Sequence, residues 1–272
     1  AGVIENVNNP DETRLTKGLR RIQHINDINQ IRKLLSLLKD EYLSPNDIAI
    51  DGITRRQLLM MNFCIWGKET KFDREQDGLL RLKEKPTLCR ELVQLLDYNL
   101  NKISNIAPDI DLPFNCLMTL HANYTTDEIL SALGHYSKDY HPQLREGVFH
   151  IKSIKTDIFL VTLSKTDGDY SPTTMYEDYA ISETLFHWQS QSTTSTDSPT
   201  GKRYIEHHQN NHTILLFVRE NKSKNDLSVP YYFLGPVDYV SHSGNKPINF
   251  IWQLRYSMPA KLYRKTARAV VC

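Results

Sequence analysis

The sequence predicts an α+β protein, with an N-terminal helical bundle followed by a β-rich open barrel with flanking helices. From about residue 13 to residue 105, Leu and Ile recur every three or four positions with charged residues opposite, which is the period of an amphipathic helix. From Gly147 onward, short apolar runs are separated by clusters of Gly, Pro, Asp and Asn, a pattern typical of a mostly antiparallel sheet or an open barrel. We therefore expect two domains, at residues 1–108 and 109–272.

The helical part contains local signals for where its helices begin and end. A helix is expected to open at a cap formed by Asn26 or Asp27. A second follows a Ser-Pro-Asn-Asp turn and ends near Gly67. A third opens at Pro86, since proline is favoured at the first helical position. This region is expected to link or couple the second domain to other parts of a larger protein.

The period changes after a linker near residues 106–113. The segment "CLMTLHANYTTDEILSALGHY" predicts a short strand and then a helix capped by Thr125 or Thr126. Six later segments predict strands: "VFHIKSI", "DIFLVTLSK", "TLFHWQSQ", "HTILLFVRE", "YYFLGPVDYVSHSG" and "INFIWQLRY". Trp252, in the last of these, alternates with polar neighbours and is expected in the core. The Ser/Thr-rich "SQSTTSTDSPTG" predicts a long, flexible loop inside the second domain.

Composition limits the classes of protein to consider. The 272 residues carry 33 Lys and Arg against 32 Asp and Glu, so any nucleic-acid site has to be a local basic patch. The four cysteines include no CxxC pair, which favours reduced thiols in a cytosolic protein over disulfides or a zinc ribbon. No apolar run reaches the ~18–20 residues of a membrane span. The chain opens on Ala, so we expect a fragment of a larger protein.

Catalytic motifs are mostly incomplete. "SPTGKRY" lacks the first glycine and the hydroxyl of a phosphate-binding loop, so we expect no ATP site here. His150, Lys152 and Asp157 match the HxKxxxxD spacing of phospholipase-D-type nucleases, yet Asp157 runs into an apolar strand and no second copy is found. A nuclease using these residues stays the alternative. "HHQNNH", residues 207–212, predicts a solvated hairpin turn and no zinc site. We expect no enzyme activity from this chain alone.

A pocket for a flipped-out nucleobase requires aromatic faces for the ring and an acid or amide for its edge. Tyr176 and Asp178, followed by Trp188 and Gln189, supply these residue types within a short stretch. A carboxylate suits cytosine because it accepts a hydrogen bond from the exocyclic amine. From the residues alone, aromatics packed in a β core with Asp178 capping a turn is the competing interpretation.

The motifs "SPTTMYEDYAIS", "LFHWQSQ" and "FLGPVDYVSH" make residues 110–268 resemble the C-terminal region of SauUSI-like type IV restriction enzymes, which depend on modified cytosine. In that family a phospholipase-D-like nuclease and a DEAD/DEAH helicase precede this region. The resemblance implies a reader domain akin to the SET-and-RING-associated (SRA, PUA-like) fold, which flips 5-methylcytosine out of duplex DNA. Readers of another mark, such as phosphorothioate or hydroxymethylcytosine, remain an alternative.

The resemblance also implies roles for individual residues. The base pocket is expected to involve Tyr176, Asp178, Tyr179, His187, Trp188 and Gln189. Beside these, the DNA groove and backbone are expected to be contacted by Thr173, Gln191, Ser192, Lys202, Arg203, Tyr204, Lys261, Arg264 and Lys265. For the Lys and Arg residues of this set, solvated surface charges are the competing interpretation. No cofactor or metal is expected in this fragment, because ATP and Mg²⁺ belong to the motor. The expected partners are double-stranded DNA carrying modified cytosine and the helicase and nuclease domains of the same polypeptide.

Overall fold

The computed structural model describes residues 10–40, 51–67, 72–103, 107–136, 147–163, 178–224 and 227–266. The chain divides into two compact units. The first consists of Ala1–Ile106 and Cys116–Pro142, and the second of Ala107–Asn115 and Gln143–Cys272. Within the described ranges, no helix combines the length and the apolar character needed to cross a membrane.

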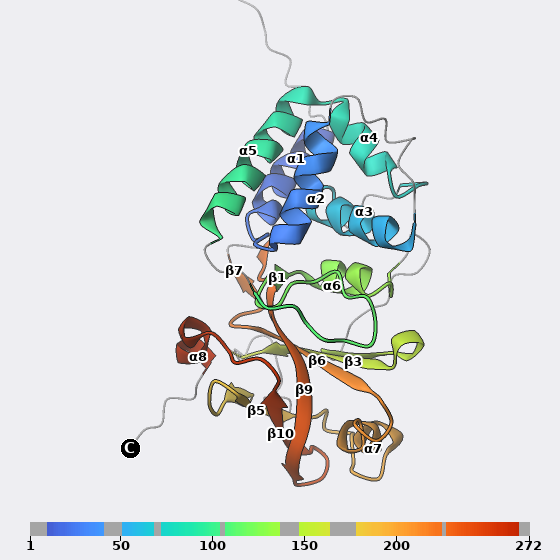
Figure 1. The fold of residues 1–272 in the computed structure, drawn as a ribbon, viewed down its shortest axis with the longest axis vertical. Helices are drawn as coiled ribbons and strands as arrows, with labels where there is room; N and C mark the ends of the chain where they lie inside the picture. The colour runs from blue at the N-terminus through green and yellow to red at the C-terminus, as the bar shows by residue number, and fades with distance from the viewer. Residues whose placement is uncertain are drawn as a thin grey trace, which may run out of the picture. The chain divides into compact units, whose positions relative to one another are not determined.

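The first unit is helical, as the sequence predicts. Its elements are α1 (Pro10–Ile22), α2 (Ile28–Lys39), α3 (Gly52–Ile65), α4 (Asp77–Lys83), α5 (Pro86–Lys102), β1 (Asn123–Tyr124) and α6 (Thr126–Ala132). Helix α1 packs on α3 and α5, α2 packs on α5, and α6 packs on α3 (Figure 1). The apolar faces meet in one core that includes Ile22, Leu34 and Leu58. The three- and four-residue spacing of apolar side chains produces this packing.

Helix starts in this unit follow the local signals in the sequence. Asp27 caps α2 by accepting hydrogen bonds from the backbone N–H groups of Asn29 and Gln30, at 2.8 and 3.2 Å. Thr125 caps α6 in a capping box with Glu128. Helix α5 opens at Pro86. These predictions are confirmed because capping depends only on residues close together in the chain.

Residues 116–136 belong to the helical unit, whereas the predicted boundary after residue 108 assigned them to the second domain. Asp27, which is fully buried, accepts a hydrogen bond from the Tyr124 hydroxyl. The hydroxyl of Thr119 also donates to Asp27, at 2.8 Å, and its backbone N–H donates at 3.2 Å. One buried carboxylate therefore caps α2 and ties this later segment to it, an association that a sequence read in order does not reveal.

The second unit is built on one sheet with short helices. Its elements are β2 (Val148–Ile151), the 3₁₀ turn η2 (Lys152–Ile154), β3 (Thr156–Thr162), β4 (Tyr179–Ala180), β5 (Leu185–Gln189), α7 (Pro199–Ile205), β6 (Thr213–Arg219), β7 (Ser223–Lys224), β8 (Leu227–Ser228), β9 (Tyr231–Ser243), β10 (Asn249–Leu254) and α8 (Ala260–Thr266). The strand order is β2-β3-β6-β9-β10-β5-β4, and β7 pairs with β8 separately. Figure 1 shows α7 and α8 on either side of the β9–β10 pair.

The sheet is mostly antiparallel, as the sequence predicts, but it is mixed because one pair of strands runs parallel. Strands β3 and β6 run parallel, with Ile158 opposite Leu215, while the other pairs along the order are antiparallel. Both strands are buried along almost their whole length, as parallel strands covered on both faces usually are. Their unbroken apolar runs, "IFLV" and "ILLFV", were the available sequence signal for this arrangement.

Helix α7 replaces the end of the predicted Ser/Thr-rich loop. The Ser198 hydroxyl accepts a hydrogen bond from the backbone N–H of Gly201 at 3.1 Å, and Pro199 occupies the first turn. Serine followed by proline is a strong helix-start signal. The loop prediction is wrong from Pro199 onward, because the cap at Ser198 starts a helix despite the Ser/Thr-rich composition before it.

The core of the second unit is aromatic. Phe159 on β3 stacks on Trp188 of β5, with ring centroids 4.0 Å apart, and Trp252 of β10 meets Phe159 edge-on at 5.7 Å. Trp252 is fully buried, so its predicted place in the core is confirmed. Burying rings of this size supplies much of the apolar area that stabilises a domain of this size.

We expect Gly18→Ala to destabilise the chain while Gly52→Ala does not. A Cβ on Gly18 of α1 would overlap the backbone carbonyl of Ile65, whereas a Cβ on Gly52 of α3 meets nothing within 4 Å. Overpacking of this kind costs about 1–3 kcal/mol, although Ala has the higher helix propensity. Urea unfolding of both variants measures the difference. Equal free energies of unfolding would contradict a close approach of α1 to α3.

Candidate nucleic-acid interface

Strand β5 places its side chains alternately on two faces of the sheet. Phe186 and Trp188 point into the core and are 0% and 4% exposed, while His187 and Gln189 are half-buried on the opposite face. The sequence predicted Trp188 as one wall of a base pocket. In the structure its ring lies against Phe159, so a base could stack on that side of Trp188 only by displacing Phe159. Trp188 supports β5 from the core side.

The opposite face carries a row of side chains that sequence reasoning recognised only in part. Tyr179 of β4 pairs with His187, and their rings stack with centroids 4.8 Å apart and an angle of 18° between planes. The Gln189 side-chain amide donates to Asn249 Oδ1 of β10 at 2.9 Å, and Ile251 lies opposite His187. We term these five half-buried residues the outward row. Aromatic faces beside amides are the groups on which unpaired bases stack and hydrogen-bond.

Asp178 fixes the edge of this face. Its Oδ1 atom accepts a hydrogen bond from the backbone N–H of Gln189 at 2.9 Å, which joins the start of β4 to the end of β5. The structure thus places Asp178, Tyr179, His187 and Gln189, four of the six residues expected in the base pocket, close together. The other predicted residues of this region, Tyr176 and Thr173, lie outside the described part of the chain.

Asn249 and Ile251 were missed by sequence reasoning. The alternation in "INFIWQL" shows that Phe250 and Trp252 share one face and that Asn249 and Ile251 share the other. The sequence shows this alternation, but it does not show that β10 pairs with β5. Strands that are far apart in the sequence leave no local pattern that identifies them as partners.

The predicted groove residues after β5 fall into different environments. Gln191 supports a turn, since its side-chain oxygen accepts from the Thr194 hydroxyl at 3.2 Å and its backbone carbonyl accepts from the Thr194 N–H at 2.9 Å. Ser192 is exposed. On α7, Lys202 is exposed, but Tyr204 is 1% exposed and meets Phe159 edge-on at 5.1 Å. Tyr204 is therefore a core residue in this structure.

Helix α8 carries the predicted C-terminal cations. It lies beside β4, where the Tyr263 hydroxyl donates to the backbone carbonyl of Ile181 at 3.4 Å. Lys261 and Arg264 are exposed, and Lys265 pairs with Glu220 at 3.3 Å. The exposed cations thus belong to the helix next to the strand that carries Tyr179.

The nuclease alternative meets a different arrangement around Asp157. This carboxylate is 1% exposed and accepts hydrogen bonds from Arg203, at 2.7 and 3.0 Å, and from His212 Nε2, at 2.7 Å. Burial raises the pKa of Asp157, but the hydrogen bonds from His212 and Arg203 outweigh it and the pKa is lowered. His150 lies opposite Asp157 in the sheet, and its ring centroid is 5.0 Å from that of His212. Lys152 is exposed on η2, and among the described residues no hydrogen bond or ion pair joins it to this cluster, although its charge acts on His150.

The cluster around Asp157 therefore has the character of a buried ion pair that fixes α7 against β3. Arg203 occupies both carboxylate oxygens, so a role for Arg203 in holding DNA would require it to leave Asp157. The hydrogen bonds from Arg203 and His212 to Asp157 were not predicted. Both residues are far from Asp157 in the sequence, so no local pattern indicates that they meet it.

His207 corrects the predicted solvated turn at residues 207–212. It is 1% exposed, its Nδ1 lies 3.1 Å from the carbonyl oxygen of His212, and its Nε2 accepts from the backbone N–H of Tyr239 at 2.9 Å. A neutral ring protonated on Nδ1 satisfies both contacts. Protonation of Nε2 would break the hydrogen bond that this atom accepts from the Tyr239 N–H. Burial also disfavours the charged ring, and the pKa of His207 is lowered to about 4. Among the three histidines of this turn, His208 is the exposed one.

We expect the free energy of unfolding to fall as the pH drops from about 6.5 to about 4. In this range His207 is protonated in the unfolded chain but stays neutral in the folded chain, so acid favours unfolding. The contribution of this one residue is up to about 3 kcal/mol. His207→Gln retains an acceptor for Tyr239 but does not titrate, so its stability should depend less on pH. Urea unfolding at several pH values, with the exposed His208→Gln as control, measures this. Identical pH profiles for wild type and His207→Gln would contradict it.

Comparison with known proteins gives one family assignment. Among solved structures, the chain is similar to Arabidopsis thaliana SUVH6 in complex with SAM, with 11% identity and a TM-score of 0.33 over 85% of this chain and 40% of that one. A likeness at that TM-score supports no conclusion, and this chain spans less than half of the solved chain. No curated protein matches it. The family described as a domain of unknown function, DUF3427, matches residues 118–266, more than half of the chain and all of the outward row. The chain therefore belongs to the DUF3427 family.

Proposed function

We propose that the second unit binds DNA and recognises a modified cytosine, in the first place 5-methylcytosine, turned out of the duplex onto the outward row. The observation that carries this proposal is the stacked pair Tyr179–His187 lying beside the paired amides of Gln189 and Asn249. An aromatic surface binds any base, whereas amides positioned at its rim hydrogen-bond the base edge. Together they provide affinity and selectivity on a rigid sheet.

Asp178 and Ile251 have separate roles in this proposal. An ionised carboxylate offers about four lone-pair positions, so Asp178 can accept from the cytosine amine while it accepts from the Gln189 N–H. Ile251, opposite His187, is the apolar member of the outward row and would contact the methyl group at the cytosine C5 position. Burying one methyl group contributes about 0.8 kcal/mol. Most of the discrimination among bases would then come from the polar groups.

DNA backbone contacts are assigned to α8. Lys261 and Arg264 are exposed on the helix beside β4, and Lys202 is exposed on α7. Lys and Arg near phosphates contribute affinity that is independent of sequence and sensitive to salt. Since the net charge of the chain is only +1, such a local patch would have to supply the electrostatic attraction.

The resemblance to SauUSI-like type IV restriction enzymes supports a wider role. In this proposal the chain is the target-recognition part of a bacterial cytoplasmic, ATP-dependent endonuclease. Its helicase and phospholipase-D-like nuclease, with their ATP and Mg²⁺, would lie in other parts of the same polypeptide. The chain itself would bind DNA without cutting it. Readers of hydroxymethylcytosine or phosphorothioate would use the same face with a different fit at the C5 position or the backbone.

We expect Tyr179→Ala to weaken binding to a 5-methylcytosine duplex at least about fivefold, because stacking on an aromatic side chain contributes about 1–3 kcal/mol per base. Fluorescence anisotropy with methylated and unmethylated duplexes of one sequence measures the change. Tyr98→Ala is the matched control, since Tyr98 is an exposed tyrosine of α5 in the helical unit.

The same duplexes distinguish the reader from its rivals. Retention of methylated DNA with no cleavage supports the reader. Cutting of DNA that is abolished by His150→Ala would support the nuclease in its place. A methylation preference unchanged in Tyr179→Ala would show that the outward row is not the base site.

We expect Lys261→Ala and Arg264→Ala to weaken binding equally for methylated and unmethylated duplexes, because phosphate contacts carry no base information. Each variant should reduce the slope of log affinity against log salt by about 0.9, the value for one phosphate contact. Titrations at four salt concentrations, with Lys17→Ala of α1 as control, test this. A slope equal to that of the wild type would exclude α8 from the DNA contact.

A further inference from the structure

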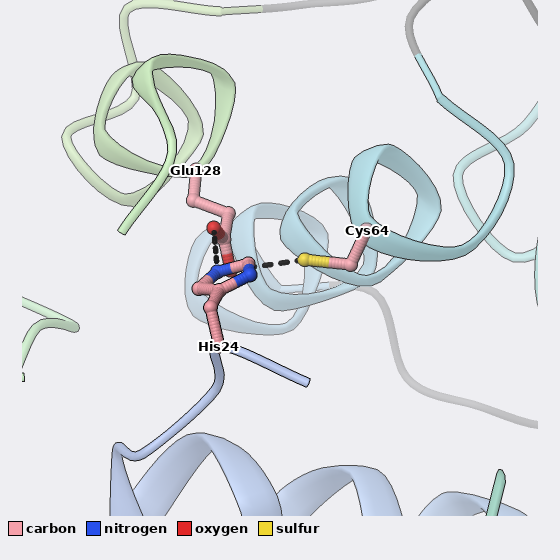
Figure 2. A group of neighbouring side chains, drawn as sticks. All are labelled: His24, Cys64 and Glu128. Atoms are coloured by element: carbon pink, nitrogen blue, oxygen red, sulfur yellow. Dashed lines mark hydrogen bonds and ion pairs between the residues drawn. The ribbon is translucent and has the colours of Figure 1, made fainter. Parts of the chain in front are cut away.

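Three side chains from distant parts of the first unit meet in its interior. His24 lies between α1 and α2, Cys64 lies on α3, and Glu128 lies on α6 (Figure 2). The His24 Nε2 atom is 2.8 Å from Glu128 Oε2, and the Cys64 Sγ atom is 2.9 Å from Glu128 Oε1. Glu128 is fully buried and Cys64 is 2% exposed. The potential ligand atoms of all three residues lie within 4.8 Å of one another.

The backbone fixes the orientation of the imidazole. His24 Nδ1 contacts the carbonyl oxygen of Arg21, and a carbonyl can only accept, so Nδ1 carries a proton. Nε2 then faces the Glu128 carboxylate. Two acceptors at 2.8 Å would repel one another, so a proton lies between Nε2 and the carboxylate in this arrangement. A tetrahedral Zn²⁺ bound to both atoms would replace that proton and hold them about 3.3 Å apart, a shift of about half an ångström.

In the absence of metal the cluster is an imidazolium, a carboxylate and a thiol. Burial opposes a charge on His24, but Glu128 outweighs it and the pKa of His24 is raised. Burial would raise the pKa of Glu128, yet His24 and its other hydrogen-bond donors lower it to about 2. Burial and the neighbouring Glu128 raise the pKa of the Cys64 thiol. The formal charge of the three groups sums to zero.

We propose that His24, Cys64 and Glu128 form a zinc site. Imidazole nitrogen, thiolate and carboxylate are the ligands that Zn²⁺ takes in proteins, and a backbone contact on the other imidazole nitrogen is the usual support of a zinc-bound histidine. On binding, Zn²⁺ enters while the Nε2 proton of His24 and the Sγ proton of Cys64 leave. The exchange of one dication for two protons leaves the net charge of the buried cluster unchanged.

Gln30 lies at the remaining side of the cluster. Its Nε2 atom donates to Glu128 Oε1 at 2.9 Å, while its Oε1 atom is buried and has no hydrogen-bond partner among the described residues. A half-turn of the amide exchanges its oxygen and nitrogen, which brings the oxygen beside the carboxylate. Gln30 or a water molecule then completes the four ligands that Zn²⁺ prefers.

Two other groups of possible metal ligands in the described residues are less suited. In the cluster of His150, Asp157 and His212, both carboxylate oxygens are already paired with Arg203, a cation that would repel a metal ion. In the cluster of His207, His208 and Asp238, the two ring nitrogens of His207 are engaged by backbone groups. In the His24 cluster no arginine of the described residues bonds to the carboxylate: the Arg21 guanidinium donates to the backbone carbonyls of Cys64 and Ile65 instead. The other donors to Glu128 are neutral groups of Thr125, Gln30 and Cys64.

A zinc ion here would be a structural clip for the helical unit. It would join residues 24, 64 and 128, which are up to 104 positions apart. Ligands from different segments have to be brought together before the metal binds, so the free energy of metal binding adds to that of folding. This role is independent of DNA binding by the second unit.

The test uses the full chain with Co²⁺ as a spectroscopic substitute for Zn²⁺. Cys64, Cys89 and Cys116 are free thiols, so the triple variant Cys89→Ser/Cys116→Ser/Cys272→Ser isolates Cys64. We expect that variant to bind one Co²⁺ per chain and to show the near-ultraviolet thiolate-to-cobalt charge-transfer band, with loss of the band on addition of Zn²⁺. Cys64→Ser, with the other three cysteines intact, should lack it.

Two further readouts keep the proposal testable if Cys64→Ser fails to fold. Zn²⁺ titration of the wild type in weak buffer should release at least one proton per ion near pH 7, because the Cys64 thiol has to lose its proton to bind the metal. Saturating Zn²⁺ should raise the melting temperature of the triple variant by several degrees. A triple variant with no charge-transfer band, or Zn²⁺ uptake by the wild type without proton release, would overturn the zinc site and leave a metal-free hydrogen-bonded cluster.

Discussion

The stacking of Trp188 on Phe159 determines which face of β5 is available for binding. Because side chains alternate along a strand, burying Phe186 and Trp188 places His187 and Gln189 on the other face. The registers of β4 and β10 then align Tyr179, Asn249 and Ile251 with them. A shift of one residue in β5 would bury the polar pair and expose the aromatic pair, at the cost of the whole core contact. The chemistry of the outward row is therefore a consequence of how the aromatic core packs.

Buried carboxylates hold the parts of each unit that apolar packing alone would leave loosely placed. Asp157 draws Arg203 of α7 against β3, which keeps Tyr204 of the same helix edge-on to Phe159 and Trp188. In the helical unit, Asp27 and Glu128 are fully buried. Each accepts a hydrogen bond from a residue about a hundred positions away in the chain, Asp27 from Tyr124 and Glu128 from His24. A buried carboxylate is tolerated only when its donors are in place, so each of these groups favours one arrangement of the surrounding segments over alternatives.

Features that depend on neighbours in the chain could be predicted, and features that depend on distant partners could not. The caps at Asp27 and Thr125 and the helix start at Pro86 follow from residues within one turn. The parallel pairing of β3 with β6 and the placement of Asn249 beside Gln189 require strand partners that no local pattern specifies. Trp188 is an intermediate case. The alternation in "LFHWQ" already assigned it to the face opposite His187, but its aromatic character suggested a binding role.

The energetics of methyl recognition explain why a reader would rely on a rigid sheet. A single methyl group contributes about 0.8 kcal/mol, which is roughly a fourfold preference. Groups that are already held in the bound geometry lose little entropy on binding, so that small difference is not offset by ordering costs. Gln189 meets this condition twice, because its side chain is held by Asn249 and its backbone by Asp178. Asp178 both anchors the strand and offers an acceptor to a base amine. Contact with a base at Asp178 would therefore act directly on β5, the strand that carries His187 and Gln189 of the outward row.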